Sequence, residues 1–157
     1  MSGEGAPEIT VDGTGLTISI VAGQWHTEIS EGLLAGAHRV LAASGATVTE
    51  IRVPGSFELP VVAKAALDAG ADGVVALGVI IRGGTPHFEF VSDAATSGLT
   101  QVALLTGKPV GFGVLTLDDE QQGIDRAGFA DSKEDKGAEA AEAVLATAVL
   151  LRSIRGN

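Results

Sequence analysis

The stretch from Gly73 to Val91, GVVALGVIIRGGTPHFEFV, decides the fold. Its first part, Val74 to Ile81, is apolar and β-branched and lacks polar alternation, which is typical of a strand covered on both faces in a parallel sheet. Directly after it come a fixed cation, Arg82, then two glycines, a hydroxyl and an imidazole. We therefore expect a central strand with a cluster of polar groups at its carboxyl end.

The residues after this strand combine groups suited to an anion and to a proton. Gly83 and Gly84 leave backbone N–H groups open to a phosphate, and Thr85 adds a hydroxyl donor. After Pro86, which stiffens the turn, His87 carries an imidazole that takes up and releases protons near neutral pH. Each group alone also fits a plain turn or a solvated histidine. Their combination at one strand end favours an anion site with a proton carrier.

Several motifs along the chain are similar to those of one enzyme family. LGVIIRGGTPHFEFV, with VPGSFELP upstream and GVLT, DRAG and DKGAEAA downstream, resembles the 6,7-dimethyl-8-ribityllumazine synthase family from about Leu16 to Arg155. The resemblance implies a transferase at the penultimate step of riboflavin biosynthesis, which condenses 5-amino-6-(D-ribitylamino)uracil with 3,4-dihydroxy-2-butanone 4-phosphate. The products are the lumazine, phosphate and water, and no cofactor is needed. The alternative is a non-catalytic flavin- or lumazine-binding protein, or a shell-forming protein, on the same scaffold.

The resemblance also assigns roles to individual residues. It makes His87 the proton carrier in catalysis, and it implies that the remaining site residues bind the substrates. These are, for the phosphate, Gly84, Thr85 and Arg126, with Gly83 and Lys136 as secondary candidates, and, for the pyrimidine and ribityl groups, Trp25, Ser56, Phe57, Glu58, Val79, Ile80, Ile81 and Phe112.

Three of these residues also have ordinary structural interpretations. Trp25 lies where a strand passes into a helix, so its indole either plugs the core or stacks on a heteroaromatic ring in a ligand crevice, and we favour stacking. Glu58, near a helix N-terminus, complements the helix dipole or accepts hydrogen bonds from a polyol. Arg126 ends an acidic block in a common helix charge pattern, yet its guanidinium also suits bidentate binding of oxyanions.

Strand and helix patterns alternate along the chain and predict an α/β fold. We expect a three-layer sandwich, with a four-stranded parallel sheet of flavodoxin-like order 2-1-3-4, helices on both faces and right-handed crossovers. Ligand sites in such sheets lie at the carboxyl ends of the strands. Residues 1–15 are expected to form a flexible arm and residues 16–157 a single domain. The predicted strands are Leu16–Ala22, Val48–Val53, Val74–Ile81 and Pro109–Thr116. The first predicted helix ends near Ser44, and the others span Leu59–Ala69, Phe88–Leu105 and Lys133–Arg155.

Composition argues against several classes of protein. A net charge of −10 disfavours nucleic-acid partners, because Lys and Arg must neutralise phosphates in such complexes. The absence of cysteine excludes disulfides and thiolate chemistry. No apolar run approaches the ~18 residues of a membrane span and no secretory pattern begins the chain, so we expect a cytoplasmic protein. Glu89 and Asp93, four apart on a helix, are typical of solvated surface, and we expect no metal site.

Assembly follows from the resemblance, which implies homopentamers with active sites at the subunit contacts and names riboflavin synthase as a candidate partner. Shell-forming relatives have a short, glycine-kinked connection where this chain has the longer, acidic segment from Gly128 to Lys136. We therefore expect a free pentamer. The sequence departs from the family pattern at Leu117, Gln121 and Gly123, which bears on helix packing, and at Gly84, which leaves only backbone donors there.

Overall fold

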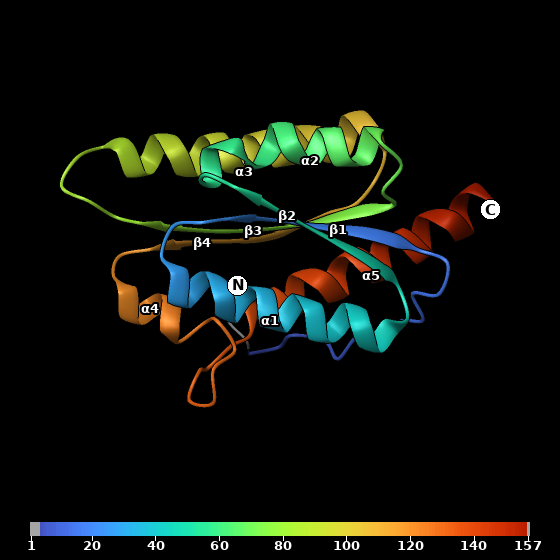
Figure 1. Cartoon of the computed structure of the whole chain (residues 1–157), viewed down its shortest axis with the longest axis horizontal. Helices are drawn as coiled ribbons and strands as arrows, with labels where there is room; N and C mark the ends of the chain where they lie inside the picture. The colour runs from blue at the N-terminus through green and yellow to red at the C-terminus, as the bar shows by residue number, and fades with distance from the viewer. Residues whose placement is uncertain (1–3, 157) are drawn as a thin grey trace.

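A four-stranded parallel sheet forms the middle layer of the computed structural model, which describes residues 4–156 (Figure 1). The strand order is β2-β1-β3-β4, so the predicted order 2-1-3-4 is confirmed. β3 is buried over nearly its whole length, as its continuous apolar sequence predicted. The strands are β1 (Thr17–Gly23), β2 (Thr47–Val53), β3 (Gly73–Ile81) and β4 (Val110–Leu117).

Helices cover both faces of the sheet, which confirms the three-layer α/β prediction (Figure 1). One face carries α1 (Thr27–Ser44), α4 (Glu120–Ile124) and α5 (Lys136–Arg155). The other carries α2 (Leu59–Asp68), which follows the short 3₁₀ turn η1 (Ser56–Glu58), and α3 (His87–Thr106). No helix within residues 4–156 is long and apolar enough to cross a membrane.

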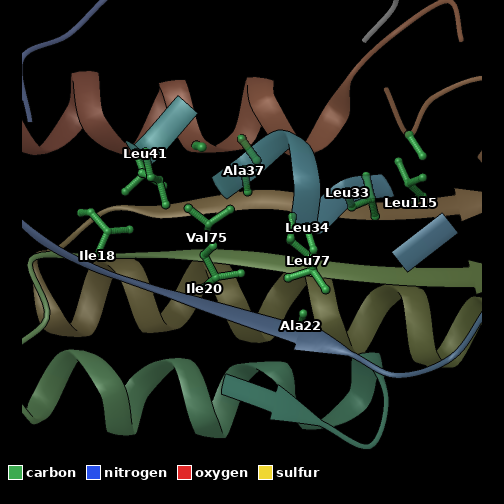
Figure 2. Close-up of a cluster of buried hydrophobic side chains, with 14 of the residues drawn as sticks. Ile18, Ile20, Ala22, Leu33, Leu34, Ala37, Leu41, Val75, Leu77 and Leu115 are labelled. Atoms are coloured by element: carbon green, nitrogen blue, oxygen red, sulfur yellow. The ribbon is translucent and has the colours of Figure 1, made fainter. Parts of the chain in front are cut away.

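The sheet divides the apolar core in two because side chains alternate across each strand. Val75 and Leu77 of β3 face α1 and α5, whereas Val74 and Ala76 face α2 and α3. Full burial of one such aliphatic side chain contributes about 1.5–3 kcal/mol to folding. Figure 2 shows the α1 side of this core, where side chains of β1 and β3 point toward those of α1, including Ile18, Ile20, Ala22, Leu33, Leu34, Ala37 and Leu41.

The segment between β4 and α5 differs from its prediction. Asp118 to Gly128 is helical only over α4, where the Asp119 side chain accepts a hydrogen bond from the Gln122 backbone. The last helix begins at Lys136 and not at Lys133, because the carboxylate of Asp135 caps it by accepting a hydrogen bond from the Ala138 N–H. The backbone of Asp135 also pairs with that of Ala127 in an isolated antiparallel bridge. The link is therefore a folded turn that lies against the α4 segment.

Two of the departures from the family pattern compensate each other. Gly123 of α4 is buried, and a Cβ atom there would lie only 2.9 Å from Cδ1 of Leu117 and would also collide with Ile29. The side chains of Ile29 and Leu117 together thus occupy the space that a side chain at position 123 would need. Gln121 donates a hydrogen bond of 2.9 Å to Asp125 and stays on the surface.

The described part of the predicted arm, residues 4–15, contains no strand or helix, and residues 1–3 lie outside the described structure. Val11 packs against the core on the α1 side, and the Gly13 N–H donates to the Ser44 carbonyl over 2.8 Å. The end of the arm is therefore attached to its own chain. The division into an arm and a domain stays a prediction.

Candidate active site

A cavity of about 370 Å³ opens at the carboxyl ends of the strands, where such folds bind ligands. It lies between the segments that follow β1, β2 and β3, and the loop after β3 leads from it into α3 at the left of Figure 1. Its lining includes ten of the sequence-predicted residues, namely Trp25, Ser56, Phe57, Glu58, Val79, Ile80, Ile81, Gly83, Thr85 and His87.

Trp25 stands at the mouth of this cavity. The preceding residue, Gln24, donates a side-chain hydrogen bond of 3.1 Å to the Val53 carbonyl, which ties the end of β1 to the end of β2. The indole lies over Gly55, where a Cβ atom would be 3.1 Å from its Cδ1 and Nε1 atoms. Trp25 is 66% exposed, so the core-plug interpretation is wrong and the flat face is open to a ligand.

The turn after β2 presents three different surfaces to the cavity. Ser56 is buried and packs closely on Gly78 of β3, where a side chain would collide with its hydroxyl. Phe57 is 64% exposed and offers an apolar ring. Glu58 is half-buried, and its carboxylate can accept hydrogen bonds from a polyol in the cavity.

The loop after β3 brings His87 to the cavity as the first residue of α3. Its backbone N–H donates to Oγ1 of Thr85 at 3.5 Å, so the hydroxyl and the imidazole leave neighbouring positions of one turn. Gly84 lies in the same loop but does not line the cavity. Because Gly83, Thr85 and His87 are all exposed, their donors are accessible to an anion from solvent.

Arg82 does not act as the free cation that its sequence position suggested. Its guanidinium binds two carboxylates, with Nη1 2.6 Å from Oε1 of Glu89 and Nε 3.0 Å from Oδ1 of Asp118. Hydrogen bonds from Arg82 lower the pKa of both carboxyls, and those to Asp118 and Glu89 raise the pKa of the guanidinium. Arg82 therefore carries a neutralised charge next to the cavity.

The other predicted binding residues lie around a second cavity, of about 560 Å³, beside the edge strand β4. Phe112, 47% exposed, lines it together with Arg126 and Lys136. Nη1 of Arg126 donates to the Gln122 carbonyl at 2.9 Å, and Lys136 pairs with glutamates on either side of it in sequence, Glu134 and Glu139. The two cavities share no lining residue. A single chain therefore does not bring Arg126 to His87.

Four residues that line the first cavity were not predicted, namely His26, Gly55, Phe88 and Val91. His26 has a left-handed backbone, with φ of 56°, and is the only non-glycine residue with positive φ in the described chain. Nothing in its sequence context announces that conformation. Val91 could have been found, because the residue four positions after His87 is its neighbour on the helix surface.

A family model described as 6,7-dimethyl-8-ribityllumazine synthase matches residues 15–152. The chain belongs to the 6,7-dimethyl-8-ribityllumazine synthase family. Proteins with that name are 79% identical in Clavibacter sepedonicus and 77% identical in Clavibacter michiganensis subsp. michiganensis, with 99% of each chain aligned. The Leifsonia xyli subsp. xyli protein of the same name is 72% identical over 99% of this chain and all of its own length.

Family membership confirms the predictions of an enzyme, a transferase of riboflavin biosynthesis with small-molecule substrates. The alternative of a non-catalytic binding or shell-forming protein is not supported, because relatives this similar over nearly their full length are named as synthases. The roles of individual residues stay predictions. Within residues 4–156, no group of three or more His, Cys, Asp or Glu side chains is arranged to hold a metal ion.

Proposed function

We propose that the first cavity binds 5-amino-6-(D-ribitylamino)uracil and orients it for condensation with 3,4-dihydroxy-2-butanone 4-phosphate. The observation that carries this is the juxtaposition, in one cavity, of an exposed indole, a carboxylate acceptor and a histidine at a helix start. The pyrimidine stacks on Trp25, with Val79, Ile80 and Ile81 beneath it, because a flat heteroaromatic ring gains most from such apolar faces. Glu58 and Ser56 accept or donate hydrogen bonds to the ribityl hydroxyls.

The reaction then requires proton transfers and orientation of two reactants. The 5-amino group attacks the ketone and releases water to form an imine, phosphate leaves, and a second attack closes the ring. His87 is the group that takes up and returns the protons, because its imidazole opens into the cavity beside Thr85. The backbone of Gly83 and Gly84 and the hydroxyl of Thr85 bind the phosphate, and the amine and ketone supply the rest of the reactivity.

Arg126 and Phe112 complete the site from an adjacent subunit. In support, both residues line a cavity separate from that of His87, and each cavity carries a large exposed aromatic side chain at its rim. A contact between unlike surfaces of two copies is head-to-tail, and such contacts close into rings. We infer a homopentamer in which each chain gives His87 to one site and Arg126, with Lys136 beside it, to the next.

The pentamer is proposed to remain free. The link before α5 is acidic, and its backbone is hydrogen-bonded to the α4 segment, with the N–H groups of Lys133 and Glu134 donating to the Asp125 carbonyl at 2.8 and 3.1 Å. Asp131 is exposed in this link and adds negative charge that repels a second ring, whereas Glu134 is paired with Lys136. Light scattering of the purified protein should give a mass near five chains, and a mass near sixty would contradict the proposal.

We also infer the compartment and a partner of the enzyme. A net charge of −10 favours solubility in the cytoplasm, where its small-molecule substrates are made. Riboflavin synthase, which consumes the lumazine, is the candidate partner. Co-sedimentation of the two purified enzymes tests that association, and independent sedimentation at micromolar concentrations would remove it.

The experiment that tests the shared site is complementation between two inactive variants. His87→Ala and Arg126→Ala are unfolded together in urea and refolded as a mixture, and lumazine formation is followed by absorbance. In a mixed ring about one quarter of the subunit contacts combine an intact His87 with an intact Arg126, so activity should recover to about one quarter of wild type. Each variant refolded alone is the control.

Two outcomes contradict different parts of the proposal. If the wild-type protein forms no lumazine from the two substrates, the condensation itself is wrong. If wild type is active but the mixture is no faster than the average of the two variants, a single chain supplies both residues and the shared site is wrong.

A further inference from the structure

Arg82 connects three segments at the edge of the first cavity. Besides its ion pairs with Glu89 of α3 and Asp118 after β4, its guanidinium lies 4.3 Å from the centre of the Phe88 ring. Its backbone N–H donates to the Leu117 carbonyl at 2.8 Å. A planar guanidinium suits this arrangement, because it can bind carboxylates along its edges while its face stacks on a ring.

The loop that Arg82 begins has little other support. A Cβ atom at Gly83 or Gly84 would meet nothing within 4 Å, so neither residue packs against the rest of the chain. Two consecutive glycines also have more conformational freedom to lose than other residues. The positions of Thr85 and His87 therefore depend on how the ends of the loop are held, and the pair between Arg82 and Glu89 joins those ends directly.

The same guanidinium is linked to the segment that carries Arg126. Asp118, held by Arg82, has its backbone N–H 2.7 Å from Oε1 of Gln122, and the carbonyl of Gln122 accepts the hydrogen bond from Arg126. One chain of polar contacts thus runs from the start of α3 to α4. His87 directly precedes two partners of Arg82, Phe88 and Glu89, in the first turn of α3.

We propose that Arg82 is a positioning residue for the condensation: it closes the loop over Gly83 to Pro86 and fixes the first turn of α3, which carries His87. The inference rests on the proposed function, in which His87 moves the protons and the loop binds the phosphate. Arg82 itself is not a phosphate ligand, because two carboxylates already neutralise its charge. Exposed ion pairs contribute little to stability, so the effect appears in turnover.

Steady-state kinetics of Arg82→Gln and Glu89→Gln test the proposal. Both changes free the loop, so each should lower kcat about tenfold, since misplacing a reacting group by an ångström costs up to ~10² in rate. KM for the phosphorylated ketone should stay within about twofold, and the double variant should be no slower than either single one. Arg82→Lys, which keeps the charge but not the planar fork, should fall between wild type and Arg82→Gln.

The matched control is Lys64→Gln, which removes another exposed ion pair. Lys64 pairs with Asp68 over 2.7 Å on α2, and neither residue lines the first cavity. This variant should keep the kcat of wild type. Thermal melting and light scattering of all variants show whether they fold and assemble. If Arg82→Gln does not, Glu89→Gln and Asp118→Asn carry the test, and each must lower kcat.

A cycle with His87→Ala separates positioning from general damage. If Arg82 acts through His87, the tenfold loss in Arg82→Gln should disappear when His87 is already alanine. Persistence of the full loss in that background would overturn the proposal. If KM for the phosphorylated ketone rises in Arg82→Gln and falls in Glu89→Gln, Arg82 binds the phosphate directly and the proposal is wrong. If kcat is unchanged in Arg82→Gln, Arg82 has no role in the condensation and the proposal is also wrong.

Hydrogen exchange provides a second measurement that does not need activity. Amides of residues 83–89 should exchange faster in Arg82→Gln than in wild type or Lys64→Gln, because their loop has lost its closure. Unchanged exchange there would overturn the positioning role. If exchange rises but wild-type protein forms no lumazine, the proposed function fails while the structural link stands.

Discussion

The cavity beside His87 and the cavity beside Arg126 are built in different ways. The first is formed by turns that leave the carboxyl ends of neighbouring strands, and it gathers an indole, two small donors and an imidazole. The second runs along an edge strand and the start of a helix, and it carries Arg126 together with Lys136, which is paired with Glu134 and Glu139. In a chain with a net charge of −10, the first cavity has its one adjacent guanidinium neutralised. Neither half is equipped for both substrates, and this division of labour argues for a site shared by two copies.

The largest effect that would test this division is expected at His87. His87→Ala should lower kcat by about 10² to 10⁴, because a lost proton carrier typically costs that much, and the low end is expected since amine and ketone already react readily. Lumazine absorbance at saturating substrates measures it. His38→Ala is the control, because His38 pairs with Glu50 over 2.6 Å and lines neither cavity. A kcat within twofold of wild type in His87→Ala would remove proton transfer from the first cavity.

Arg126→Ala should affect the other substrate. Truncating one partner of a partly buried charge pair costs about 2–4 kcal/mol, so kcat/KM for the phosphorylated ketone should fall roughly 30- to 1000-fold. Binding of 5-amino-6-(D-ribitylamino)uracil, which carries no phosphate, should be equal in the variant and in wild type. Arg52→Ala, which removes an exposed partner of Glu31, controls for loss of charge. An equal loss of affinity for both substrates would mean that Arg126 is structural and that the second cavity binds no phosphate.

Trp25→Ala should weaken lumazine binding more modestly. An aromatic pair contributes about 0.5–1.5 kcal/mol beyond burial, which corresponds to a roughly 2- to 13-fold higher Kd. Titration calorimetry measures the change. Trp25→Phe retains a flat apolar ring and should recover most of the affinity. Identical Kd values for wild type and Trp25→Ala would place the pyrimidine elsewhere.

The smallest effect concerns the contribution of Glu142, in α5, to stability. Burial, then the charges of Glu139 and Asp135, raise the pKa of Glu142, and Arg39 only partly opposes them. The folded protein therefore binds this proton more tightly than the unfolded chain, so ionisation of Glu142 destabilises the fold above the raised pKa. Glu142→Gln should raise Tm slightly at pH 7, and the gain should vanish as the pH falls through that pKa to the usual glutamate range. A gain that persists at pH 3.5 would exclude ionisation as its cause.

The stability contributed by Glu89, beside the first cavity, should change with pH in the opposite direction. There the pKa of Glu89 is lowered by its hydrogen bond from Arg82, so its contribution to stability is present above the usual glutamate pKa and is lost as the pH falls through the lowered one. Acid thus affects the contributions of Glu142 and Glu89 to stability in opposite directions.

The sequence predicted the sheet and the first cavity well because both depend on local patterns. The buried run of β3 set the centre of the sheet, and polar groups after three strands converge because parallel strands share one carboxyl edge. The helix predicted from Lys133 fails because the capping carboxylate of Asp135 and the bridge to Ala127 depend on tertiary contacts. The neutralisation of Arg82 by Asp118 was also beyond reach, since those residues lie 36 positions apart.

The isolation of Trp25 makes this protein spectroscopically simple. The chain has one tryptophan and no tyrosine, so almost all of its absorption and emission near 280–350 nm originates at the mouth of one cavity. Because the indole is already 66% exposed in a single chain, unfolding of that chain alone changes its surroundings little. Its emission should therefore respond mainly when a ligand or an adjacent subunit covers the cavity. Emission from this protein reports occupancy, and the state of its fold has to be followed through the backbone amides by circular dichroism.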